Sequence, residues 1–193
     1  MKKRVVLACL IFCICVFISG CGNKTRTAEE FIKDFDALLQ EHREELSMEE
    51  EVSIEDKKIE ISYDEDYEAY VVKYNGNTGG TFMVYNSDGE VLSQEERKSL
   101  PLNQTYIMGA CKYDSTNWYA AELTGSVLID CFDDNTNGYV DSLNKYWELW
   151  VDAINKEGWT EESLESKKYG KCNFTVEKDN LFIITFDNEV EES

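Results

Sequence analysis

The stretch KKIEISYDEDYEAYVVKYNGNTGGTFMVYNSDGEVLS, Lys57–Ser93, decides the fold. It contains four runs rich in β-branched and aromatic residues, KKIEISY, YEAYVVKY, GTFMVY and GEVLS, separated by YDED, NGNTGG and NSDG. Asn-Gly, Gly-Gly and Asp-Gly steps favour hairpin turns because glycine adopts positive φ at little cost. The pattern, which begins near Val52, therefore predicts a four-stranded antiparallel meander.

A long amphipathic helix is predicted before this meander. Thr27 followed by Glu30 has the spacing of a capping box, which marks the start of a helix. Apolar residues then recur at helical spacing, so that the helix is expected over residues 28–47: Phe31, Phe35, Leu38, Leu39 and Leu46. Such a stripe must be covered by another layer. The order of a long helix and then a meander resembles cystatin-like α+β folds, which implies a sheet wrapped around the helix.

The rest of the chain predicts a second set of helices and strands. Ser93 and Glu96 repeat the capping pattern and Pro101 is the only proline, so a short helix and a lobe boundary are expected near residues 94–105. Residues 117–124 fit either a helix or a strand. We expect strands over 105–113 and 125–132, a helix over 141–158, a turn of helix over 160–170 and a hairpin over 173–186.

These elements predict an α+β fold within four sequence segments. Residues 1–20 are expected to be a signal peptide, residues 21–26 a tether, and residues 27–100 the helix with its meander. Residues 101–193 are expected to form a second helix-plus-strands segment of the same compact domain.

The first segment has the charge and hydropathy of an export signal. Lys2, Lys3 and Arg4 precede an apolar run, Val5–Ile18, of about fourteen residues. A helix needs roughly twenty residues to cross a bilayer, so this run is short for a membrane span. We therefore expect the segment to direct export.

The residues after this run resemble the lipobox of bacterial lipoproteins, with Ile18, Ser19, Gly20 and Cys21 in the required order. The resemblance implies cleavage before Cys21 and a lipid anchor, including palmitate, on that cysteine. It places the mature chain on the extracytoplasmic face of the cell membrane. The five residues Gly22–Arg26 would hold the folded part within roughly 18 Å of the bilayer.

The mature chain is strongly acidic. The full sequence has 19 basic and 39 acidic residues, and removal of the signal peptide leaves 16 basic residues, a net charge near −23. A field of this sign repels nucleic acid, so we expect none as a partner. It attracts cations and basic peptides or proteins. The same composition also suits a solvated surface that resists aggregation.

One stretch, FDDNTNGYVDSLN, has the ligand spacing of a calcium loop. Asn144 stands at the twelfth EF-hand position, which needs a bidentate carboxylate, and the preceding residues 125–132 look like a strand. A tight turn at Asn137-Gly138 followed by a helix cap from Asp141 or Ser142 accounts for the same residues. The sequence thus predicts a weak calcium site or a turn, with these candidate ligands: Asp133, Asn135, Asn137, the Tyr139 carbonyl and Asp141.

Cysteines and aromatic residues each leave two interpretations open. Cys111, Cys131 and Cys172 permit one disulfide outside the cytoplasm, whereas buried free thiols are the alternative.

The aromatic residues of the C-terminal half could line a peptide or sugar groove. The alternative is that they face the core, because the apolar stripe of a helix must be buried. They are Tyr146, Trp147, Trp150 and Trp159.

Motifs of common enzyme classes are absent from the sequence. It contains no zinc-protease, P-loop, dinucleotide-binding or nucleophile-elbow motif, and its only histidine, His42, is expected on the surface of the first helix. We therefore predict no catalytic residues. The sequence favours a non-enzymatic, lipid-anchored binding module for basic peptides or proteins. The alternative is a weak calcium-binding lipoprotein that uses the loop at residues 133–141.

Overall fold

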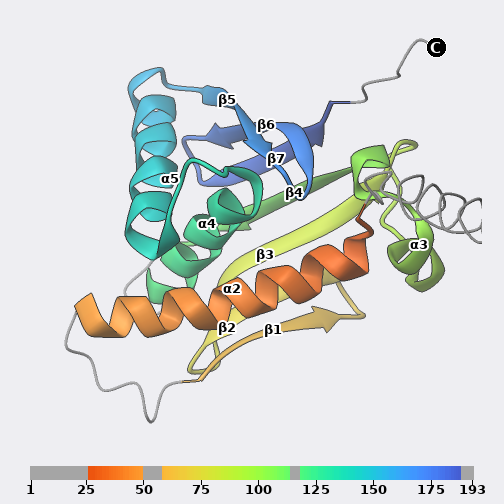
Figure 1. Cartoon of the computed structure of the whole chain (residues 1–193), viewed down its shortest axis with the longest axis horizontal. Helices are drawn as coiled ribbons and strands as arrows, with labels where there is room; N and C mark the ends of the chain where they lie inside the picture. Colours follow the sequence, from red (N-terminus) through yellow and green to blue (C-terminus); the bar gives the residue numbers. More distant parts are fainter. Residues whose placement is uncertain (1–25, 50–57, 114–117, 188–193) are drawn as a thin grey trace, which may run out of the picture.

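The computed structural model describes residues 26–49, 58–113 and 118–187 (Figure 1). The signal peptide and Cys21 lie outside the described residues. In chain order the elements are α2 (Ala28–Glu49), β1 (Ile59–Asp64), β2 (Ala69–Tyr74), β3 (Asn77–Asn86), α3 (Gln94–Ser99), the short 3-10 helix η1 (Leu102–Gln104), β4 (Thr105–Cys111), α4 (Trp118–Phe132), α5 (Gly138–Asn155), β5 (Trp159–Ser166), β6 (Gly170–Glu177) and β7 (Leu181–Phe186).

The strands form one antiparallel sheet in the order β1-β2-β3-β4-β7-β6-β5. Helices α2, α4 and α5 pack against one of its faces (Figure 1). β3 and β4 pair along the whole length of β4, so the sheet continues across Pro101 and both sequence segments contribute to it. The fold is α+β, as the sequence predicts, and the sheet covers three helices.

Helix α2 starts where its capping box predicts. The Glu30 amide donates to the Thr27 hydroxyl at 3.3 Å, and the Thr27 amide donates to the Glu30 carboxylate at 3.0 Å. Phe31 is fully buried, with its ring against Phe82 of β3 and Phe132 of α4. The apolar stripe of α2 therefore joins the sheet to the other helices.

Three strands of the predicted meander are present as β1, β2 and β3. Asn75 and Gly76 have positive φ at the turn between β2 and β3, as expected for an Asn-Gly hairpin. The prediction of a fourth sequential strand was wrong, because GEVLS makes only an isolated bridge between Val91 and Tyr85. The place beside β3 is taken by β4, which forms a longer ladder.

The strand predicted at residues 125–132 is also wrong, because these residues are the second half of helix α4. Nearly every residue of α4 is buried, so the helix has no polar face and its sequence resembles that of a buried strand. The helix lies very close to β3. A Cβ atom on Gly79 would lie 2.4 Å from the Ala120 Cβ, and one on Gly80 would lie 2.2 Å from the Thr124 hydroxyl oxygen.

The turn of helix predicted at residues 160–170 is in fact strand β5 and the turn into β6. Leu164 and Ser166 of β5 are buried, whereas Glu161 and Glu165 are exposed, which is the two-residue period of a strand. The run looks unlike a strand because it lies at the edge of the sheet and exposes its polar residues. The helix at 141–158 and the hairpin at 173–186 are confirmed as α5 and as β6–β7.

Within the described ranges, no helix combines the length and the apolar character needed to span a membrane.

Candidate functional site: the open face of the sheet

The sheet face opposite the helices has no helix packed on it in the part of the chain that the structure describes (Figure 1). We call this surface, over β3, β4, β7, β6 and β5, the open face. Its side chains alternate along each strand with those that face the helices. The centre of the open face is formed by Met83, Tyr85, Tyr106, Met108, Leu181 and Ile183.

Register brings these central side chains into contact across the strands. Met83 lies opposite Met108, which lies opposite Ile183. Tyr85 and Tyr106 stack with ring centroids 4.9 Å apart and planes 6° from parallel, and the Tyr85 hydroxyl donates to the Met83 sulfur at 3.1 Å. Burial and the neighbouring Tyr106 raise the pKa of Tyr85 above its ordinary value.

Exposure of this centre is unusual for apolar side chains. Met108 is 37% exposed and Leu181 is 44% exposed. Contiguous apolar patches on soluble proteins often mark interaction sites. Methionine side chains change shape easily, which suits a surface that accepts varied partners.

Acidic side chains border the centre on the β6 and β5 side. Thr175 of β6 separates Ile183 from Glu161 of β5, and Lys171 of β6 lies opposite Glu165. Lys171 is the only basic residue on this border within the described strands. The acidic residues at open-face positions are Glu161, Glu165, Glu177 and Asp187.

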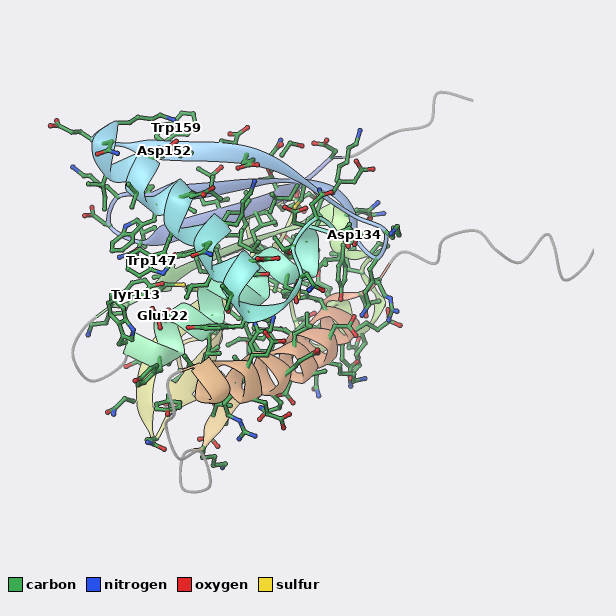
Figure 2. The ribbon with its side chains drawn as sticks, turned by 60° about the vertical axis from the view of Figure 1, so that its left-hand side comes forward. Tyr113, Glu122, Asp134, Trp147, Asp152 and Trp159 are labelled. Carbon is green, nitrogen blue, oxygen red and sulfur yellow. The ribbon has the colours of Figure 1, made fainter. Side chains whose placement is uncertain are left out.

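An aromatic cluster lies at one end of the molecule. Figure 2 shows Tyr113, Glu122 and Trp147 near one another, with Asp134 at the opposite end. The Tyr113 ring stacks on Trp150 at 5.2 Å and contacts Trp147 at 5.5 Å. The Trp150 indole donates to the Lys178 carbonyl at 3.0 Å, which fastens α5 to the turn between β6 and β7.

The aromatic residues of α5 and β5 differ in burial, and a groove lined by them stays a prediction. Tyr146 is fully buried and belongs to the core, whereas Trp147 and Trp150 are half-buried in the aromatic cluster. Trp159 is 59% exposed on edge strand β5, at an open-face position opposite Glu177.

The predicted calcium-loop residues lie between α4 and α5 and in the first turn of α5. The Asp133 carboxylate is buried and accepts from the amide and the side chain of Asn135 at 2.9 and 2.8 Å. Asn137 is the N-cap of α5, whereas Tyr139 and Asp141 already belong to its first turn. The preceding residues form helix α4, contrary to the strand predicted there. Calcium binding stays a prediction of the sequence. The turn at Asn137-Gly138 is present, but the predicted cap from Asp141 or Ser142 was wrong, because both residues lie inside α5.

A carboxylate from a distant helix occupies the start of α5. Glu45 of α2 accepts from the Tyr139 amide at 2.6 Å. A negative group at a helix N-terminus satisfies a free amide and interacts favourably with the helix dipole.

Among the residues that the structure describes, no three acidic, histidine or cysteine side chains gather as a metal ion would require.

His42 lies in the core, so the expectation of a surface residue was wrong. Its ring is fully buried between the Ser126 hydroxyl, 2.9 Å from Nδ1, and the Asp130 carboxylate, 3.0 Å from Nε2. These are the residue types of a hydrolase triad, but Ser126 is also fully buried and contacts the Leu123 carbonyl at 3.2 Å. The arrangement joins α2 to α4 and holds the serine away from solvent.

The three cysteines within the described part of the chain are buried free thiols, and no disulfide joins any two of them. Cys111 lies on β4, Cys131 on α4 and Cys172 on β6. Burial raises the pKa of Cys111 and Cys172 to about 12, and it also raises the pKa of Cys131. The structure thus has buried free thiols, the alternative to a disulfide in the sequence analysis, and these thiols behave as small apolar groups.

No family model matches the chain. No curated protein and no solved structure is similar to it at a significant level.

Proposed function

We propose that this chain is a lipid-anchored, extracytoplasmic binding module that holds basic peptides or proteins on the open face without transforming them. The observation that carries the proposal is the exposed apolar centre around Met108, bordered by acidic side chains on β5 and β6. Apolar contact supplies affinity, and the acidic border selects partners of positive charge.

Charge decides which occupant suits the open face. The full chain has a formal net charge of −20, so two copies repel each other and a second copy is a poor occupant. Nucleic acid is disfavoured for the same reason. A basic polypeptide with alternating apolar residues matches both the acidic border and the apolar centre.

The anchor rests on the lipobox residues that end at Cys21. With the five-residue tether, a bound basic partner would be held within about one domain diameter of the bilayer. A module at this position would intercept cationic peptides before they reach anionic lipid.

A pair of substitutions with the same charge change tests the proposed surface. The probe is a blocked peptide in which valine and arginine alternate, added to the full-length protein in a neutral maltoside detergent at about 0.3 M salt, where the screening length is roughly 5 to 6 Å. Met108→Lys places a positive charge on the open face, whereas Val151→Lys places it on the solvent side of α5, where Val151 is 44% exposed.

Under the proposal, Met108→Lys weakens peptide binding by roughly tenfold or more, because one buried apolar contact and one repelled charge each contribute on the order of 1 kcal/mol. Val151→Lys should have little effect in the same salt. Equal effects of the two substitutions, or complete release of the peptide from the unsubstituted protein at this salt, would show that the acidic surface attracts cations without a specific site.

A further inference from the structure

A pocket of about 380 Å³ opens at the end of the open face, between the start of β3, the end of β4 and the turn that joins β6 to β7. Thr81 and Ala110 belong both to the pocket and to the open face, so a chain on the face reaches the pocket directly. The lining residues that the argument uses are Thr81, Ala110, Lys112, Tyr113, Asp179 and Asn180.

The walls of this pocket are fixed by backbone contacts. The Cys111 amide donates to the Asn180 carbonyl at 3.0 Å, and the Lys112 amide donates to the Gly79 carbonyl at 2.7 Å. The end of β4 is thus tied to both neighbouring segments. On the opposite side of β3, α4 leaves no room behind Gly79, so β3 cannot move back. A preformed pocket loses little free energy to ordering when it binds.

Two residues with hydrogen-bond acceptors, Asp179 and Asn180, line the side of the pocket formed by the turn between β6 and β7. Asp179 is exposed and makes no ion pair with any other described residue. The side-chain oxygen of Asn180 is buried without a hydrogen-bond partner among the described residues, which is costly unless a donor arrives. Tyr113 adds an aromatic wall next to these acceptors.

We propose that this pocket receives an arginine side chain of the partner, with the guanidinium at Asp179 and Asn180 and its methylene groups beside Tyr113. The inference rests on the proposed function, because it names the side chain that the partner inserts at the end of the open face. A guanidinium has five donors in a fixed plane, which suits a carboxylate and a neighbouring amide oxygen. The pocket volume accommodates one such side chain.

Replacement of Lys112 tests the proposal, because the direction of the change in arginine affinity depends on the charge of the ligand. Lys112 lines the same pocket, and its positive charge disfavours a second cation nearby, so its removal should strengthen arginine binding, whereas it should weaken the binding of an anion. Removal of the Asp179 charge should act in the opposite direction. A pocket that selects only by shape would respond to neither charge.

The probes are N-acetylarginine amide and its neutral isostere N-acetylcitrulline amide. NMR titration measures their binding to the full-length protein in neutral detergent. The unsubstituted protein should bind the arginine derivative roughly tenfold or more tightly than the citrulline derivative. Asp179→Asn should abolish this preference, and Lys112→Ala should increase it. Asp66→Asn is the matched control, because Asp66 is exposed in the turn between β1 and β2, outside the pocket lining, and its substitution removes one charge as well.

Equal binding of the two derivatives, a loss of arginine binding in Lys112→Ala, or identical behaviour of Asp179→Asn and Asp66→Asn would overturn the inference. Failure of the proposed function looks different. In that case the pocket still prefers arginine, but Met108→Lys and Val151→Lys affect binding of the valine–arginine peptide equally.

Discussion

Gly138 shows how single residues decide what the loop between α4 and α5 does. Its φ of +78° lies in the left-handed region, which favours glycine. A Cβ atom there would lie 2.7 Å from the Glu45 carboxylate oxygen that caps α5. The glycine that fits a calcium loop by sequence is therefore required here by a turn and by a helix cap.

Gly138→Ala should lower the free energy of unfolding by about 1 kcal/mol for the left-handed backbone and by about 1 kcal/mol more for the displaced Glu45 cap. Gly170→Ala is the matched control, since Gly170 has a φ of +77° and nothing within 4 Å of the added Cβ atom. Denaturant unfolding measures both variants. The same loss in the two would show that Glu45 contributes nothing to the start of α5.

Asp130 makes the stability of the fold depend on pH in the acid range. Burial alone would raise the pKa of Asp130, but hydrogen bonds from His42 and Thr136 hold the pKa below its ordinary value. A carboxylate with a lowered pKa stabilises the fold above its unfolded pKa of about 3.9, and this contribution is lost as the pH falls through the folded pKa.

Asp130→Asn should therefore reduce stability near neutral pH and flatten the loss of stability below about pH 5. The measurement is the free energy of unfolding across the acid range for the two proteins. Asp66→Asn, at an exposed turn, serves as the control. Parallel curves for the Asp130→Asn variant and the unsubstituted protein would assign the acid sensitivity to other carboxylates.

At the scale of elements, α4 packs so closely on β3 that no side chain fits at Gly79. Gly79→Ala would bring a methyl group within 2.5 Å of the Ala121 backbone nitrogen, which cannot rotate away. Overpacking against a backbone should cost about 3 kcal/mol or more. Gly158→Ala, whose added Cβ atom has its nearest contact at 3.8 Å, should cost far less in the same denaturant unfolding experiment. A Gly79→Ala protein of normal stability would show that α4 does not lie this close.

Two elements show where the sequence patterns failed. The pattern correctly predicts α2, α5 and the β6–β7 hairpin, because each has one buried and one exposed side. Helix α4 is buried on all sides and strand β5 is polar on both faces at the edge of the sheet, so neither sequence shows the hydrophobic period typical of its structure. Such elements depend on tertiary contacts that a local pattern does not contain.

The candidate site was only partly predictable for a related reason. Net charge predicts a basic partner class from composition alone. The open face, however, depends on Met83, Met108 and Ile183 meeting across β3, β4 and β7, and β7 enters the sheet beside β4 out of sequence order. No local signal indicates that register.

At the scale of the whole molecule, the sheet has two similar halves. α2 precedes the meander β1–β3, α5 precedes the meander β5–β7, and β4 separates the two meanders. The N-terminal part of α2 lies at the Asp134 end, since Asp34 pairs with Lys168 at 2.8 Å and Asp134 pairs with Lys167 at 3.4 Å. Tyr113 and Trp147 of the aromatic cluster lie at the opposite end (Figure 2), and Tyr113 also lines the pocket.

The lipid anchor expected at Cys21 can be tested by substitution and by inhibition of signal cleavage. Cys21→Ala should leave the precursor uncleaved and without lipid, which the larger size of the chain on a denaturing gel would detect. Globomycin, which blocks lipoprotein signal cleavage, should make the unsubstituted precursor accumulate. A Cys21→Ala protein that is cleaved and membrane-bound like the unsubstituted chain would contradict the anchor.

The most direct test of the central claim is to locate a bound basic peptide. A photoreactive amino acid replaces Met108 on the open face in one full-length protein and Val151 on α5 in another, and each is irradiated with the valine–arginine peptide at about 0.3 M salt. Both positions are comparably exposed, at 37% and 44%, so accessibility alone favours neither. The account predicts that the peptide crosslinks to position 108 and hardly at all to position 151. Equal crosslinking at the two positions, or crosslinking only at position 151, would contradict it.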